Sequence, residues 1–482
     1  MSRVLRVILP AILGWTVLPL SGASGQSSDG RPNVVFILAD DLRPDTLGYA
    51  GHSLVRTPEI DRLASRGAVF TRATCSYPIC FVSRSEMFSG RVLLGAGSGA
   101  VKFDPAWPLW PEQMKRAGWH TVYSGKWHVA GSPASAGFVK TAGLYSGGGA
   151  AGMPLTVAVT PTVREVTGYR GWTFKNEKNQ PLPELGVGLT PETDAIITDR
   201  AVEFLRQGSA QPFFLQVSFT APHDPLLWPP GENATRGHDD ISLPANFRPE
   251  HPFDTGNIGG RDESIVPAPR TSEDVQKEWA LYLRQVENLD RQVGRIVRVL
   301  EETGQLARTI VVFTSDHGLA LGSHGLMGKQ NQYEHTINVP LVMAGPGIPS
   351  GKRFSAQCYL RDLYPTLCDL TGVPVPASVQ ALSLVPVLRG ERMEVRDAIF
   401  GYFTDTQRMM RDADGWKVIW YPAQQKYQLF NVTADPDELR DLAADPAQQG
   451  RLARMKLGLR DWQRQYNDPL LANLPKSDSP AR

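Results

Sequence analysis

Acidic side chains directly follow two of the apolar segments in this chain, and their chemistry suggests a site for a hard cation. Asp40-Asp41 follows Val34–Ala39, and Asp316-His317 follows Thr309–Phe313. Carboxylates packed together repel one another unless a cation neutralises them, and oxygen donors suit Ca²⁺ or Mg²⁺. A single acidic residue after an apolar segment could simply cap a helix. His317 is an uncommon ligand for a hard cation, and it could instead hydrogen-bond a substrate oxygen.

Two further apolar segments lead into basic side chains that could bind an anion. Gly125-Lys126-Trp127-His128 follows His120–Tyr123, and Pro222-His223-Asp224-Pro225 follows Phe213–Phe219. Ammonium and imidazole groups can stabilise anionic oxygens and transfer protons. Asp224 could orient His223 or cap the Pro-rich turn, and we favour the capping role.

A cysteine begins the next segment of interest. The run from Cys80 to Ser89 has helical spacing and stops at Gly90, so Cys80 is expected at a helix N-terminus. The helix dipole and the free N–H groups there favour an anion. Arg84 lies one turn further on the same face. A buried, inert thiol is one alternative and a Cys nucleophile paired with His223 is another, but neither explains the nearby carboxylates.

These residues need a common scaffold, and the alternation of apolar runs with helical patterns supplies one. Val34–Ala39 is continuous and rich in β-branched residues, as in a buried parallel strand. In the longest predicted helix, from about 274 to 303, apolar residues recur every three or four positions. The spacing predicts an α/β fold with a large mixed, mostly parallel sheet flanked by helices. Ligands in such sheets bind beyond the carboxyl ends of the strands.

The chain divides into three predicted parts. Residues 1–25 show the basic, apolar and small-residue order of a secretory signal peptide, and the apolar run is short for a membrane span. A catalytic α/β domain is expected over 31–389, and a smaller C-terminal α+β domain with a loose tail over 390–482. We therefore expect a secreted or periplasmic protein without stable membrane association. The loops 131–190 and 229–270 are rich in Gly and Pro and are expected to frame a pocket.

Composition narrows the function classes. The 50 Lys and Arg residues balance 49 Asp and Glu residues, so the basic excess typical of a nucleic-acid binder is absent from the sequence. Hydrophobic residues make up 41% and charged residues 21%, as in ordinary globular domains. Four cysteines cannot form a disulfide scaffold in a chain of 482 residues, although Cys358 and Cys368 could pair.

In their order along the chain, these segments resemble the sulfatase family of the alkaline-phosphatase superfamily. The resemblance extends from about residue 31 to about 442, and each motif is weak alone while their order is specific. The motifs are Ala39-Asp40-Asp41, Cys80-x-x-Ser83-Arg84, Gly125-Lys126-Trp127-His128, Pro222-His223-Asp224-Pro225, Ser315-Asp316-His317-Gly318, Gly325-Leu326-Met327-Gly328-Lys329 and Leu429-Phe430-Asn431.

The resemblance implies hydrolysis of sulfate esters by formylglycine, the aldehyde that a maturation enzyme makes from the motif cysteine, whose hydrated gem-diol attacks sulfur. Here that residue is Cys80. It also implies one Ca²⁺ ion, whose ligands by position would be Asp40, Asp41, Asp316, His317 and the modified Cys80.

The resemblance further implies roles for five basic residues. Arg84 would steady the gem-diol oxyanion, and Lys126 and Lys329 would bind the sulfate oxygens. His223 would protonate the leaving alcohol. His128 would take a proton from the second hydroxyl, so that sulfate is expelled and the aldehyde is regenerated.

One position departs from the family pattern. The family usually has Pro or Ala two residues after the cysteine, where this chain has Val82. We expect conversion of Cys80 to formylglycine nevertheless, because every site residue of the motifs that follow it in the chain is present. The expected substrate is a sulfated carbohydrate, with choline sulfate and aryl sulfates as open alternatives. A phosphate or phosphonate ester hydrolase of the same fold is a second hypothesis, and an unconverted protein that binds sulfated glycans without cleaving them is a third.

Overall fold

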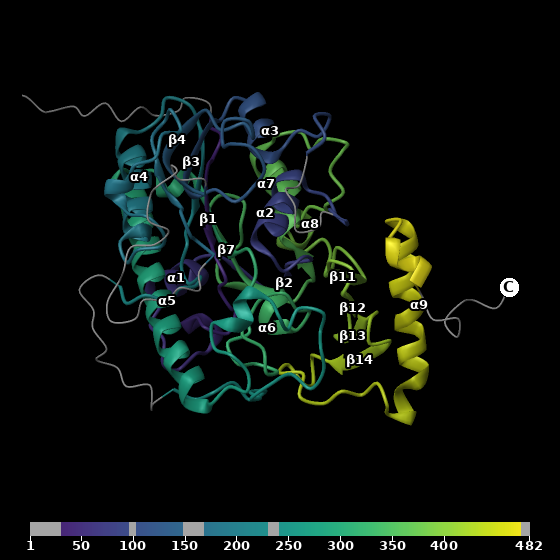
Figure 1. Cartoon of the computed structure of the whole chain (residues 1–482). Coiled ribbons are helices and arrows are strands. Elements are labelled where there is room, and N and C mark those ends of the chain that lie inside the picture. The colour runs from purple at the N-terminus through teal and green to yellow at the C-terminus, as the bar shows by residue number, and fades with distance from the viewer. Residues whose placement is uncertain (1–29, 96–102, 148–167, 230–240, 474–482) are drawn as a thin grey trace, which may run out of the picture.

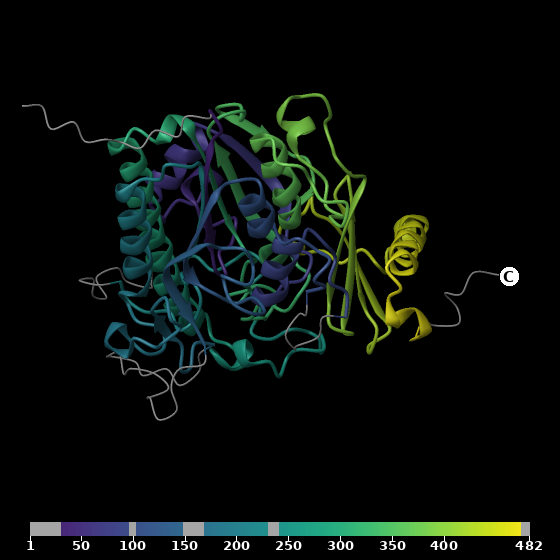
Figure 2. The same ribbon diagram turned by 90° about the horizontal axis from the view of Figure 1, so that it is seen from above.

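A computed structural model describes residues 30–95, 103–147, 168–229 and 241–473. The predicted signal peptide lies outside these residues. The described chain forms a ten-stranded sheet between two layers of helices, and a four-stranded sheet lies beyond one of these layers (Figures 1 and 2).

The strands of the large sheet are β1 (Asn33–Ala39), β2 (Ala68–Thr74), β3 (His120–Lys126), β4 (Lys140–Ser146), β5 (Thr173–Lys175), β6 (Phe213–Ser218), β7 (Thr309–Ser315), β8 (Asn338–Ala344), β9 (Lys352–Phe354) and β10 (Cys358–Tyr359). Their spatial order is β10-β2-β8-β7-β1-β6-β3-β4-β5, and β9 also pairs with β2. β8 is antiparallel to β2 and β7, and β5 is antiparallel to β4, whereas the other pairs are parallel. The predicted mixed, mostly parallel sheet is confirmed.

Strand β1 lies at the centre of the site-bearing part of the sheet. Leu38 is in register with Ser218 of β6 and Thr314 of β7, so the three strands end at one edge. Every residue of β1 is buried, because alternate side chains enter the cores on the two faces of the sheet. Burial on both faces explains why the segment is continuously apolar.

The helices are α1 (Pro58–Ser65), α2 (Cys80–Ser89), α3 (Trp110–Arg116), α4 (Thr193–Gln207), α5 (Ser272–Glu302), α6 (Glu334–Ile337), α7 (Leu363–Thr371), α8 (Val385–Leu388) and α9 (Gln449–Gln465). Helices α1, α4 and α5 cover one face of the large sheet, and α2, α3 and α7 cover the other (Figures 1 and 2). The Thr271 side chain caps α5 by accepting a hydrogen bond from the Asp274 backbone N–H at 3.2 Å, which fixes the start of the longest helix.

The C-terminal sheet is an antiparallel meander. Its strands follow one another in space as β11 (Ala398–Phe403), β12 (Gln407–Asp412), β13 (Trp416–Tyr421) and β14 (Lys426–Asn431), and α9 packs against them. This arrangement confirms the smaller α+β part of the predicted fold. The boundary between 389 and 390 stays a prediction.

The C-terminal sheet packs against the helix that begins at Cys80. Val82 of α2 is fully buried in a cluster with Tyr402, Trp420 and Trp462, so strands β11 and β13 and helix α9 all contact this segment. The position that departs from the family motif therefore has a packing role.

All four cysteines are buried free thiols, so Cys358 and Cys368 do not pair in this structure. Within the described ranges, no helix combines the length and apolar character needed to cross a membrane.

Candidate active site

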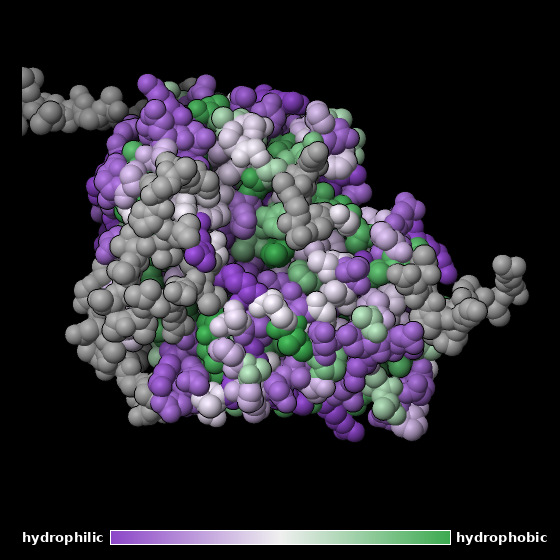
Figure 3. Space-filling view, viewed as in Figure 1, coloured by the Kyte–Doolittle hydropathy of each residue, from purple (hydrophilic) through white to green (hydrophobic). Residues whose placement is uncertain are grey.

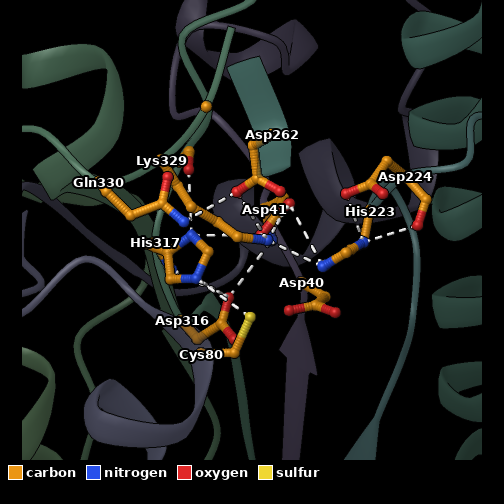
Figure 4. Close-up of polar contacts among 12 residues, drawn as sticks. Asp40, Asp41, Cys80, His223, Asp224, Asp262, Asp316, His317, Lys329 and Gln330 are labelled. Carbon is orange, nitrogen blue, oxygen red and sulfur yellow. Dashed lines mark hydrogen bonds and ion pairs between the residues drawn. The ribbon is translucent and has the colours of Figure 1, made fainter. Parts of the chain in front are cut away.

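The carboxyl ends of β1 and β7 bring the predicted acidic residues together. Asp40, Asp41, Asp316 and His317 are all fully buried at this edge of the sheet (Figure 4). The backbone N–H of Asp41 donates a hydrogen bond to Asp316 Oδ1 at 3.3 Å. Asp41 has φ 67°, a left-handed conformation that Asp tolerates better than most residues, so the chain turns sharply directly after the strand.

Helix α2 places Cys80 beside these groups. Cys80 is the first residue of the helix, as predicted, and its Sγ lies 3.3 Å from Nε2 of His317. One ligand atom from each of Asp40, Cys80, Asp316 and His317 lies within 4.8 Å of the others. Burial opposes ionisation, but Lys126, Lys329 and His317 hold the pKa of the Cys80 thiol well below its usual value. The environment therefore favours a negative charge at this position.

Arg84 connects the helix to two of the carboxylates. Its Nε donates to Asp316 Oδ2 at 2.8 Å, and its Nη2 lies 3.3 Å from Asp40 Oδ1. Ser83 adds a hydrogen bond from its hydroxyl to the Asp316 carbonyl oxygen at 2.7 Å. The Ser-Arg pair of the motif thus fixes α2 against the end of β7.

The two predicted sulfate-binding lysines also point into the cluster. Lys126 Nζ forms an ion pair with Asp40 Oδ2, and Lys329 Nζ lies 2.9 Å from Asp41 Oδ2. Burial and Cys80 would raise the pKa of Asp40, but Lys126, His223 and Arg84 lower it below its usual value. The lysines are therefore held at the site by its carboxylates.

The donor set fits a hard cation. Burial raises the pKa of Asp316 to about 7, with a further contribution from Asp40, although His317 and Arg84 oppose the change. Burial also raises the pKa of Asp41. Burial therefore makes the charged form of these carboxylates costly, and a divalent ion bound between them would offset that cost. Carboxylate oxygens are the ligands that Ca²⁺ prefers.

The contacts of His223 correct one sequence expectation. We expected Asp224 to cap its turn, but Asp224 Oδ1 lies 2.9 Å from His223 Nδ1 and orients the imidazole (Figure 4). The expectation was wrong because the other partner of Asp224 is Arg261, which is distant in sequence. Burial opposes protonation, but Asp224 and Asp41 raise the pKa of His223 well above its usual value.

His128 lies on the other side of Cys80. Its ring lies 6.0 Å from that of Phe81, the residue after Cys80, and packs edge-on against Trp172 at 5.3 Å. Trp172, which comes from the predicted pocket loop 131–190, thus lies beside the site. The face seen in Figure 1 is hollowed near its centre, beside α2, where hydrophilic and hydrophobic side chains meet (Figure 3).

The structure brings all ten predicted site residues into this cluster, and their roles stay predictions. Sequence reasoning missed two neighbours, Tyr169 and Arg261. The Tyr169 hydroxyl donates a hydrogen bond to Asp40 Oδ2, and its ring lies 4.7 Å from that of His223. Both residues come from the two long loops, whose length and composition were the only available signal.

Comparison with known proteins agrees with this geometry. Residues 32–373 match the family model described as Sulfatase, and residues 322–465 match the model described as N-sulphoglucosamine sulphohydrolase, C-terminal. An arylsulfatase of Clostridium perfringens is 27% identical over 436 residues, covering 86% of this chain and 90% of that protein.

Two solved structures share the fold. BT4656 in complex with its substrate D-glucosamine-2-N,6-O-disulfate has a TM-score of 0.69 and 24% identity, covering 91% of this chain and 99% of that one. The phosphonate monoester hydrolase of Agrobacterium radiobacter has a TM-score of 0.69 and 23% identity, covering 90% and 96%. Because the family model spans most of the chain and the cluster of predicted site residues lies inside it, this chain belongs to the sulfatase family.

Proposed function

We propose that this protein hydrolyses the sulfate esters of a sulfated carbohydrate at a centre built around Cys80. The observation that carries the proposal is the convergence of Cys80 with three carboxylates and with Lys126, Lys329 and Arg84 at one sheet edge. A sulfate group needs cations around its peripheral oxygens and a nucleophile facing sulfur, and this arrangement can supply both.

Calcium is the cation we propose for the site. Asp40, Asp41, Asp316, His317 and the modified Cys80 would hold it. The donor atoms of Asp40, Asp316, His317 and Cys80 lie within 4.8 Å of one another, and Asp41 Oδ1 lies 3.2 Å from His317 Nδ1. When bound, such an ion supplies positive charge that lowers the pKa of a hydroxyl group beside it.

We further propose that a maturation enzyme converts Cys80 to formylglycine, which supplies a hydrated aldehyde as the nucleophile. Position 80 stands at the N-terminus of α2, where backbone N–H groups favour negative charge. Arg84 lies within reach of the same carboxylates and would steady an oxyanion there.

The remaining residues bind the substrate or move protons. Lys126 and Lys329 would exchange their contacts with Asp40 and Asp41 for the sulfate oxygens. His223 would protonate the leaving oxygen from Nε2, because Asp224 already holds Nδ1. His128, whose ring lies beside that of Phe81 next to position 80, would accept a proton there.

The proposed substrate is a sulfated sugar, and the proposed location is the periplasm or the outside of the cell. The disulfated glucosamine bound by BT4656 supports a sulfated sugar, and Trp172 beside His128 offers an aromatic surface for a sugar ring. The predicted signal peptide would send the protein to the periplasm or outside the cell.

Two measurements on protein from a maturation-competent host test the proposal. Mass spectrometry of the peptide containing Cys80 should show the thiol-to-aldehyde mass loss, and the same protein should release sulfate from sulfated glucosamine. A preference for matched phosphate or phosphonate esters would favour the alternative hydrolase. An unmodified thiol with retained binding of sulfated glycans and no sulfate release would favour the binding protein.

A further inference from the structure

A single 3-10 turn, Arg261–Ser264, connects two residues of the proposed machinery that belong to different parts of the chain. Arg261 contacts Asp224, which holds His223. Two hydrogen bonds join the same segment to the loop that carries Lys329. Glu263 accepts hydrogen bonds from the backbone N–H groups of Met327 at 2.9 Å and Gly328 at 2.8 Å.

The contact between Arg261 and Asp224 uses both arms of the guanidinium group. Nη2 donates to Asp224 Oδ1 at 3.0 Å, and Nη1 donates to Oδ2. The Asp224 side chain is only 4% exposed, whereas that of Arg261 is 35% exposed. A bidentate pair fixes the plane of the carboxylate as well as its position.

The oriented carboxylate in turn fixes His223. Nδ1 of His223 lies 2.9 Å from Asp224 Oδ1 and 2.7 Å from the Asp224 carbonyl oxygen. With Nδ1 held from both sides, Nε2 faces the site, 2.8 Å from Lys329 Nζ and 3.9 Å from Asp41 Oδ2. Tyr169 limits rotation of the ring from its remaining side, with ring centroids 4.7 Å apart.

We propose that Asp224 and Arg261 are positioning residues that hold His223 with Nε2 toward the leaving oxygen, so that they set which leaving groups the enzyme can expel. The inference rests on the proposed sulfatase function. As the bond between sulfur and the leaving oxygen breaks, its electron pair stays on that oxygen. The oxygen takes the Nε2 proton, and His223 becomes neutral. Asp224 stays ionised and keeps its hydrogen bond with Nδ1 throughout, as a carboxylate that orients an imidazole does in other enzymes.

Leaving-group dependence separates this role from a purely structural one. A nitrophenolate leaves without help from an acid, whereas phenol and a sugar alcohol need a proton. A structural defect would slow all three substrates to the same extent. Loss of orientation would slow only the poor leaving groups, because general acid catalysis matters most for them.

The experiment compares Asp224→Asn and Arg261→Gln with the wild-type enzyme after formylglycine has been verified in each protein. The substrates are 4-nitrophenyl sulfate, phenyl sulfate and a sulfated glucosamine. Each variant should lose roughly 10²-fold in kcat on phenyl sulfate and the sugar, with a change below about 3-fold on the nitrophenyl ester and little change in KM. Arg248→Gln replaces an exposed arginine elsewhere in the same loop and should behave as wild type.

A double-mutant cycle tests whether Asp224 acts through His223. In a His223→Gln background, Asp224→Asn should add almost no further loss, because the group that it positions is already gone. Equal losses on all three substrates, or additive effects in the cycle, would overturn the positioning role while leaving sulfate hydrolysis intact. A verified wild-type protein that releases no sulfate from any substrate would overturn the proposed function itself.

Discussion

The Tyr402 hydroxyl, on β11 of the C-terminal sheet, donates a hydrogen bond to the carboxylate of Glu86 on α2, the helix that begins at Cys80. Glu86 also accepts hydrogen bonds from the Leu93 backbone N–H and from Arg361, each at 3.1 Å. The whole network is buried. The C-terminal sheet therefore stabilises the helix that carries the proposed nucleophile.

Tyr402→Phe should lower the free energy of unfolding by about 1.5–3 kcal/mol, because it removes a buried hydrogen bond to a charged group. Urea unfolding measures the change. Tyr466→Phe is the control, since it keeps the ring that packs against Trp462 on α9. Equal stability of Tyr402→Phe and the wild type would show that the network does not depend on this hydroxyl.

Cys80→Ala should abolish sulfate release and leave the fold intact, because it removes the precursor of the nucleophile and only one buried sulfur atom. Sulfate release and the thermal unfolding midpoint measure the two effects. Cys75→Ala is the matched control, because Cys75 is also buried and its thiol donates a hydrogen bond to the Tyr77 carbonyl oxygen at 3.0 Å. Measurable turnover by Cys80→Ala would refute the role of Cys80.

Lys126→Ala should reduce kcat/KM at least ~10²-fold, as the loss of a comparable oxyanion-stabilising group does. Lys115→Ala provides the control, because Lys115 is an exposed lysine that pairs only with Glu112 on its own helix. A near-normal rate for Lys126→Ala would remove this lysine from the sulfate-binding role.

Calcium should raise the thermal unfolding midpoint of chelator-treated protein, since an ion that binds only the folded state stabilises it by about 2.7 kcal/mol at a hundred times its Kd. Asp316→Asn should abolish the shift, because it removes one of the buried carboxylates. Mg²⁺ at the same concentration tests selectivity. A midpoint that does not respond to calcium in the wild type would argue against the proposed metal site.

Two buried histidines away from the site, His251 and His324, should each contribute a loss of stability as the pH drops from about 6.5 toward 4. Burial raises the pKa of Asp290 to about 7 and that of Asp194 to about 6, so these carboxyls contribute the opposite change. Burial lowers the pKa of His251 to about 4 and that of His324 to about 3, with Arg248 contributing to both. At these two histidines the unfolded chain therefore binds more protons than the folded chain in this window, so their protonation favours unfolding.

Urea unfolding across this pH range tests the effect. The stability of His251→Gln relative to that of the wild type should increase as the pH drops, because the variant no longer has the titrating imidazole. Tyr333→Phe removes the hydroxyl that lies 3.1 Å from His251 Nε2, so it should shift stability without removing the dependence on pH. An unchanged slope in His251→Gln would show that other groups titrate.

The sequence predicted the elements whose patterns are local and strong. β1 and β7 are continuous apolar runs because both faces of each are buried, and the Asp and His residues directly after them could be placed at one sheet edge from topology alone. β2 was missed because Thr71 and Arg72 interrupt its apolar pattern, and β8 was missed because Pro340 lies inside it.

The neighbours supplied by the long loops could not be predicted in the same way. Tyr169 reaches Asp40 across 129 positions of sequence, and Arg261 reaches Asp224 across 37. No periodic pattern marks either residue, because Tyr169 lies outside the helices and strands and Arg261 lies in a 3-10 turn of four residues. Only the unusual length of their loops indicated that such residues would exist.

Because Val82 is buried under the C-terminal sheet, chemical modification of Cys80 competes in time with the docking of that sheet. Tyr402, Trp420 and Trp462, which cover this segment, are made long after Cys80 during synthesis, and Cys80 is 2% exposed once they are in place. Chains acquire structure from the N-terminus as they emerge, so the segment stays open until the last elements close over it. The yield of modified protein would then depend on how slowly the C-terminal sheet docks. In a chain that ends before β11, Cys80 should stay accessible to modification for longer than in the full chain.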